Sequence, residues 1–191
     1  MELENKIRME AIEQQVRQWI ERIVIGLNLC PFAGTPFKNG QIRITVSQAD
    51  TDALLLDELR HELQLLRESP IETLETTLIV VAGMLTHFDG YNQFLDQAED
   101  LLQSEGWADD YQIASFHPDY MFEGTRASDP GNLTNRSPWP ILHILRESSI
   151  DAALAEYPDT DSIPRRNVRL MKSLSRQERR AYFPWLEKPA D

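Results

Sequence analysis

Two histidines, His117 and His143, flank a long polar stretch and hold the clearest potential for chemistry in this sequence. Residues 118–137 between them are rich in proline, glycine and ionisable side chains, and they show no helical or strand period. Plain connections are usually about 4–6 residues long, so this stretch is either disordered or a working loop. An imidazole titrates near neutral pH and is a common general acid or base. We therefore expect a functional loop, with both histidines as catalytic residues in one cleft.

The position of His117 supports two interpretations. The residue follows a predicted strand, and Asp119, two residues later, is expected to orient the ring as a catalytic partner. Alternatively, His117 is a strand-end histidine that hydrogen-bonds the backbone, and Asp119 forms a local Asx-turn. A catalytic role predicts a ring that reaches a pocket, whereas a structural role predicts backbone partners.

Arginines in the loop predict an anion site. The pair Ser137-Pro138 fits the start of a helix, where free N–H groups attract anions. Arg binds phosphate and carboxylate groups through two parallel hydrogen bonds, so Arg126 and Arg136 are expected to clamp a small anionic molecule. The alternative is that these arginines pair with Glu123 and Asp129 and only tie the loop down. The expected ligand-binding residues are Arg126, Arg136, Asn135, Tyr120 and Arg146.

A metal site is a further interpretation of the same region. If the predicted helix continues through His143 and Glu147, their spacing of four residues places both side chains on one helix face. With His117 they would form a set of two histidines and one carboxylate, which suits iron or zinc. A divalent metal is therefore a candidate cofactor. The spacing is common by chance, and the alternative is that His143 lines a cleft.

Cys30 is a secondary catalytic candidate. The sequence Cys30-Pro31-Phe32 is similar to the thiol motif of thioredoxin-fold enzymes, in which the cysteine begins a helix that lowers its pKa. Here Cys30 follows a long helix, so that activation is missing. Its simplest role is a small buried apolar residue, although the loop after it is long enough to bring it towards the site.

Hydrophobic periodicity places these residues on a series of elements. Helices are predicted where apolar residues recur at intervals of three and four, and strands where they alternate or run continuously. Ser175 and Glu178 match a capping box that begins a short last helix. The predicted helices are 7–27, 52–68, 88–104 and one from Pro138 past Leu145, and the predicted strands are Gln41–Ser47, Thr77–Gly83 and Tyr111–Phe116.

This order indicates an α/β or α+β domain, with a small central sheet of about three strands covered by five to six helices. If the strands are parallel, their carboxyl ends share one edge, where ligands bind in open α/β sheets. The strand exits are Ser47, Gly83 and His117, so the long loop begins at the expected mouth of a site. We expect one domain over 1–191, with a functional loop at 118–137 and a basic helical segment at 161–191.

Composition and charge narrow the class of protein. The chain has a net charge of −12, which argues against nucleic acid as the main partner because phosphate binding needs a basic surface. Residues 161–191 hold eight Lys or Arg and four Asp or Glu, and we expect this segment to fold back onto the acidic remainder. The longest apolar run is too short to span a membrane, and a single cysteine fits a reducing compartment. We expect a cytoplasmic protein with no membrane partner.

Three motifs resemble the family defined as domain of unknown function 1415. They are Leu29–Ala33, Phe116–Phe122 and Asn135–Glu147, and the resemblance extends over nearly the whole chain. It implies no particular activity, cofactor or catalytic residue. It does imply that Cys30, His117, Arg136 and His143 belong to one constellation.

The leading expectation is an enzyme that acts on a small anionic metabolite. His117 and His143 would move protons or bind a metal, and Arg126 and Arg136 would hold a phosphate or carboxylate group. The alternative is a non-catalytic module that uses the loop as a recognition surface for a small ligand or for a protein. In that case the aromatic residues Tyr120, Phe122 and Trp139 are its anchors.

Overall fold

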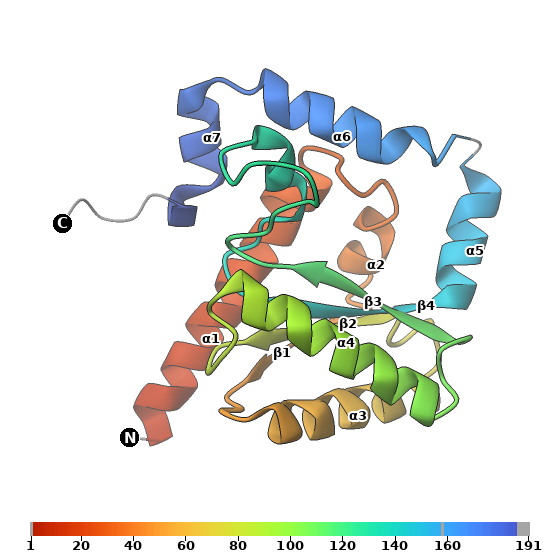
Figure 1. The fold of residues 1–191 in the computed structure, drawn as a ribbon. Coiled ribbons are helices and arrows are strands. Elements are labelled where there is room, and N and C mark those ends of the chain that lie inside the picture. Colours follow the sequence, from red (N-terminus) through yellow and green to blue (C-terminus); the bar gives the residue numbers. More distant parts are fainter. Residues whose placement is uncertain (1, 158, 187–191) are drawn as a thin grey trace.

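Helices cover both faces of a central sheet in the protein (Figure 1). The structure is a computed structural model, and it describes residues 2–157 and 159–186. The first helix, α1 (Glu2–Trp19), continues into a π-helical turn, η1 (Ile20–Ile25). The remaining elements, in chain order, are α2 (Gly34–Lys38), β1 (Ile42–Ser47), α3 (Asp52–Glu68), β2 (Thr76–Val81), α4 (Phe88–Ser104), β3 (Tyr111–Phe116), the 3₁₀ turn η2 (Pro130–Asn135), β4 (Ile141–Arg146), α5 (Glu147–Glu156), α6 (Ser162–Ser173), α7 (Arg176–Tyr182) and the 3₁₀ turn η3 (Pro184–Leu186).

The sheet has four strands in the order β1-β2-β4-β3, so the predicted α/β class is confirmed with one strand more than expected. β1 and β2 are parallel, whereas β4 is antiparallel to both of its neighbours, β2 and β3. β1, β2 and β3 therefore run in the same direction and end at one edge, at Ser47, Val81 and Phe116. The long loop begins at that edge, as predicted, but β4 separates β2 from β3.

Strand β4 occupies residues that were expected to be helical, and the prediction of a helix beginning near Pro138 was wrong. Ile141, Leu142 and Ile144 are completely buried, because β4 is paired on both sides and covered on both faces. A short, continuous apolar run has no period that separates a buried strand from a buried helix. The helix N-terminus that was expected to attract an anion beside Arg136 is therefore also absent.

The two faces of the sheet pack against different helices. Leu142 and Ile144 of β4 belong to the core formed with α3 and α4. Ile141 and Leu78 belong to a second core, formed with α1, η1 and α6. Because side chains alternate along a strand, His143 lies on the second face, where it is the cross-strand partner of Leu78.

Residues 118–137 form a loop that is organised around a buried asparagine. Asn132 is fully buried, and its Oδ1 accepts a hydrogen bond from the Phe122 N–H at 3.1 Å and lies 2.9 Å from the Thr125 hydroxyl, whose single hydrogen it shares with the Phe122 carbonyl at 2.7 Å. Its Nδ2 donates to the Arg126 carbonyl at 2.9 Å. One side chain thus joins three positions of the loop.

The basic segment folds back onto the chain, as expected. Helix α6 packs against η2, where Lys172 pairs with Asp129 at 3.3 Å. The Asn167 Nδ2 donates to the Leu29 carbonyl at 2.7 Å. Residues 187–191 of this predicted segment lie outside the described part of the chain. Among the described residues, no helix is both long enough and apolar enough to cross a membrane.

Candidate functional site

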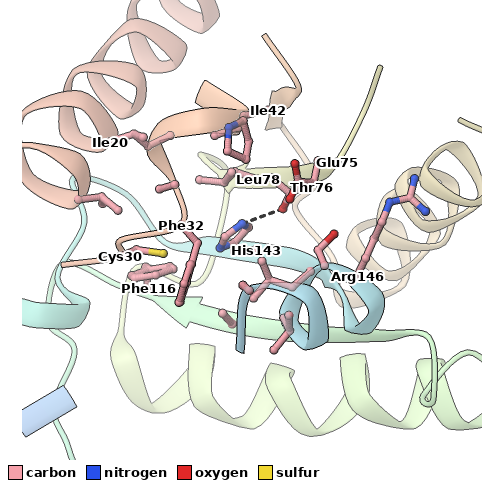
Figure 2. Close-up of a pocket in the computed structure, with 18 of the residues that line it drawn as sticks. Ile20, Cys30, Phe32, Ile42, Glu75, Thr76, Leu78, Phe116, His143 and Arg146 are labelled. Carbon is pink, nitrogen blue, oxygen red and sulfur yellow. Dashed lines mark hydrogen bonds between the residues drawn. The ribbon is translucent and has the colours of Figure 1, made fainter. Parts of the chain in front are cut away.

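A cavity of about 270 Å³ lies on the His143 face of the sheet, beneath η1, α2 and α5 (Figure 2). Its walls are mainly apolar, and ligand pockets typically combine such walls with a few polar groups. A protein cavity of about 150 Å³ is sufficient for benzene, so this volume suits a small organic molecule. Apolar wall residues include Trp19, Ile20, Phe32, Leu78 and Phe116, and the polar residues are Cys30, Glu75, Thr76, His143, Arg146 and Ser149.

The hydrogen bonds of Thr76 fix the tautomer of His143. The Thr76 hydroxyl donates its only hydrogen to the Ile144 carbonyl, at 2.6 Å. It must therefore accept a hydrogen bond from His143 Nε2, which lies 2.8 Å away. Nε2 carries the proton, and Nδ1 keeps its lone pair. No described residue hydrogen-bonds Nδ1, and the ring lies between Thr76 on one side and Cys30 and Phe32 on the other (Figure 2).

Burial lowers the pKa of His143 to about 4. The ring keeps some accessible surface, but that surface faces the apolar cavity and so gives the charged form little hydration. His143 is therefore neutral at pH 7. It offers one hydrogen-bond acceptor to any molecule in the cavity.

One end of the cavity is polar. Burial raises the pKa of the Glu75 carboxyl, and the nearby Ser149 hydroxyl and Arg146 guanidinium partly oppose that rise. The Ser149 hydroxyl is near the carboxylate without reaching normal hydrogen-bond geometry. The Arg146 Nη2 is bonded to carbonyls of α3 and of the α3–β2 connection, but its Nε is buried and has no partner among the described residues. The cavity thus contains a carboxyl whose pKa is raised and an imidazole whose pKa is lowered.

Cys30 lines the same cavity, which places this secondary candidate beside His143. Leu29 and Cys30 both donate their N–H to the Val24 carbonyl, and this turns the chain back over the sheet after η1. Burial raises the pKa of the Cys30 thiol, although the N–H groups of Phe32 and Ala33 oppose the shift. Cys30 is therefore a protonated thiol at neutral pH, as expected for a cysteine without helix activation.

His117 does not share the cavity with His143, and the expected cleft between the two histidines was wrong. The ring is fully buried against Phe88 and Tyr91, on the opposite face of the sheet. The Asp119 N–H donates to Nδ1 at 2.9 Å, so Nε2 carries the proton and donates to the Leu85 carbonyl at 3.0 Å. Burial lowers the pKa of His117. The ring therefore has the backbone partners that the structural alternative predicted, and Asp119 orients it through its backbone N–H.

The predicted metal set is also separated. His143 is in β4, while Glu147 begins α5, so the two do not share a helix face. His117 lies across the sheet from both. Within 2–157 and 159–186, no three His, Cys, Asp or Glu side chains are close enough to bind a metal ion together.

The remaining predicted ligand-binding residues lie away from the cavity, except Arg146. The Arg136 Nε donates to the Tyr120 carbonyl at 3.2 Å, and its Nη2 donates to the Ala127 carbonyl at 2.8 Å. These bonds tie the loop down, but through backbone carbonyls instead of the expected carboxylates. Arg126 is exposed, and Asn135 lines an adjoining hollow of about 820 Å³ beside α6, which shares Val24, Cys30 and Phe116 with the cavity.

Sequence reasoning missed Glu75 and Thr76, which lie at the start of β2. No motif or period distinguishes them from ordinary strand-end residues. Their role arises from β4, which places the His143 ring against the Thr76 hydroxyl across two antiparallel strands. The contact between Thr76 and His143 could have been predicted from the sequence only if residues 141–146 had been assigned as a strand paired with β2.

Replacing Asn132 by Asp should destabilise the protein by about 2 kcal/mol, because the carboxylate cannot donate to the Arg126 carbonyl and is buried there. Urea unfolding and hydrogen exchange at the Phe122 amide would measure this loss. Asn92→Asp, an exposed change on α4, is the matched control and should stay within about 0.5 kcal/mol of wild type. Equal effects in the two variants would contradict the role of Asn132.

The fold and the cavity define an α/β protein with a small, mainly apolar cavity at one face of a mixed sheet. The chain belongs to the family described as Protein of unknown function (DUF1415), whose model matches residues 11–181. Comparison with curated proteins and comparison with solved structures each give no match.

Proposed function

We propose that the chain binds a small, mainly apolar molecule that carries a hydrogen-bond donor, with His143 Nδ1 as the acceptor. The observation that supports this proposal is a neutral imidazole whose unpartnered nitrogen borders an apolar cavity. A ligand that covered this acceptor without donating to it would lose about 1–3 kcal/mol. A ligand hydroxyl or N–H would avoid that loss while its apolar part fills the cavity.

A second candidate is an enzyme that moves a proton on the same molecule. Cys30 and Glu75 line the cavity together with His143, which favours this interpretation. The pKa of about 4 argues against it, because an effective general base has a pKa near the working pH. A substrate would have to raise that pKa on binding. The binding role needs no such change and is therefore the stronger proposal.

The expected anionic group does not suit this cavity. Arg146 is the cation among its lining residues, and its Nη2 is bonded to the carbonyls of Leu66, Ser69 and Leu74, while its Nε is buried without a hydrogen-bond partner among the described residues. An anion would meet Glu75 at the same end. We therefore propose a neutral ligand for the cavity.

Two probes of similar shape test the proposal. Both p-cresol and toluene fit the volume, but only p-cresol carries an O–H donor. NMR titration should show p-cresol binding about 3–10-fold more tightly, as one net hydrogen bond of about 1 kcal/mol provides. Ala114→Leu, beside His143 in β3, should block both probes, while His143→Leu should reduce p-cresol to the affinity of toluene.

The matched control is Ala155→Leu, an exposed change on α5, which should leave both affinities unchanged. Failure of both probes to bind, or binding that survives Ala114→Leu, would refute the proposal. Incubation of a metabolite extract with wild type and His143→Leu, followed by mass spectrometry, separates the two candidates. Conversion that requires His143 favours the enzyme, and retention without conversion favours the binding protein.

A further inference from the structure

Another hollow, of about 230 Å³, lies between η2 and α7 and is lined by four arginines. Arg136 follows η2, whereas the other three belong to α7, some forty positions later in the sequence. We call this feature the arginine hollow; its arginines are Arg136, Arg176, Arg179 and Arg180. It shares no lining residue with the His143 cavity, so a ligand of the arginine hollow is independent of the proposed function.

Two carboxylates close to the arginine hollow, those of Asp129 and Glu178, already have partners. Asp129 lines the arginine hollow, but it pairs with Lys172 at 3.3 Å and accepts a hydrogen bond from the Gly131 N–H at 2.8 Å. Glu178 of α7 is bonded to Ser175 in the capping box. Asp129 and Glu178 therefore compensate little of the positive charge that Arg136, Arg176 and Arg179 bring to the arginine hollow, although Asp119 acts on Arg136 from a distance and the protein as a whole has a net charge of −12.

Several guanidinium N–H groups remain available. The Arg179 Nη2 donates to the Lys172 carbonyl at 3.1 Å, while its Nε is buried and has no hydrogen-bond partner among the described residues. Arg136 uses Nε and Nη2 for the loop, and its Nη1 is not in either bond. Arg176 is exposed on the first turn of α7, where no described residue forms a hydrogen bond or ion pair with its guanidinium.

The arginine hollow also has an apolar floor. Pro130 and Leu133 of η2 contribute one side, and Phe183 and Leu186 contribute the other. A simple surface cluster of arginines would lie on a polar surface. Here a charged rim surrounds an apolar base, and this combination suits an organic molecule that carries a strong anion.

We propose that the arginine hollow binds the phosphate group of a small organic phosphate ester. Guanidinium forks match phosphate oxygens with paired hydrogen bonds, and several arginines together suit a group that carries up to two negative charges. Arg136, Arg176 and Arg179 hold the phosphate, and the apolar floor contacts the organic part. The anion that the sequence predicted near Arg136 thus binds with partners from α7.

The proposal is tested with phenyl phosphate and inorganic phosphate at constant ionic strength, with sodium chloride as the balancing salt. Phosphorus NMR and thermal unfolding report binding, since a ligand of the folded state raises the unfolding temperature. We expect phenyl phosphate to bind more tightly than inorganic phosphate. The double variant Arg176→Gln/Arg179→Gln should weaken phenyl phosphate binding by about tenfold or more.

The matched control is Arg165→Gln/Arg169→Gln, which removes the same charge from exposed positions of α6 outside the arginine hollow. It should keep the wild-type affinity for phenyl phosphate. Arg176→Gln alone should fold normally and lose part of the affinity, because its side chain is exposed. The proposal would be overturned if phenyl phosphate raised the unfolding temperature no more than chloride does. It would also be overturned if the control variant lost as much affinity for phenyl phosphate as Arg176→Gln/Arg179→Gln.

Discussion

Acidification from pH 6.5 to pH 4 should cost the folded protein about 3 kcal/mol of its free energy of unfolding through His143 alone. The pKa of this imidazole is about 4 in the folded protein, against an ordinary value of about 6.5. Between these two values the unfolded chain binds a proton that the folded protein does not. Stability is therefore complete above about pH 6.5 and falls as the pH decreases towards 4, by about 1.4 kcal/mol per pH unit.

Urea unfolding between pH 4 and pH 7.5 would measure this dependence. His143→Gln should remove most of the slope, because the amide can still donate to Thr76 but does not titrate. His117 has a lowered pKa as well and contributes in the same direction, so some slope should remain in that variant. His61→Gln, an exposed change on α3, is the matched control and should follow wild type. A wild-type slope in His143→Gln would show that the ring is hydrated in the folded protein.

Arg146→Met should destabilise the protein by about 3 kcal/mol or more. The Arg146 Nη2 donates to the Ser69 carbonyl at 3.0 Å and the Leu74 carbonyl at 3.1 Å, and it also bonds the Leu66 carbonyl. This cation therefore joins β4 to the carboxyl end of α3 and to the connection that leads into β2. Methionine keeps much of the stem's volume but leaves these carbonyls without their charged donor. It also removes a favourable charge from a helix carboxyl end.

The matched control is Arg67→Met, which removes a guanidinium from an exposed position in the same region. Arg67 lies over the Trp107 ring at 5.0 Å, and its loss should cost only about 0.5–1 kcal/mol. Chemical denaturation of the two variants at pH 7 gives the comparison. Similar losses for Arg67 and Arg146 would show that the three carbonyls are adequately hydrated without the guanidinium.

Local patterns in the sequence were sufficient for much of the fold. Helices α3 and α4 and strand β3 occupy the predicted residues, and Ser175 and Glu178 form the predicted capping box. Each of these signals lies within a few consecutive residues. A helical stripe or an alternating strand reports which side of the element is buried, and hydrogen bonding at a cap involves only neighbours.

The site depended on contacts that no local pattern encodes. β4 was mistaken for a helix because the run from Ile141 to Arg146 is largely apolar, and only pairing with β2 and β3 makes it a strand. The assignment of β4 as a strand decides on which face of the sheet His143 lies. Cys30 lines the cavity on that face, whereas His117 lies on the opposite face.

The sequence by itself determined the α/β class, the boundaries of α3, α4 and β3, and the family, because these follow from periods and motifs along the chain. The tertiary structure decided which ionisable residues meet. His143 faces the same cavity as Thr76 and Cys30, and Arg136 faces arginines of α7. The physical reason is that a side chain's environment comes from segments distant in sequence. Strand order and crossover direction bring those segments together, and neither is a property of any single stretch of residues.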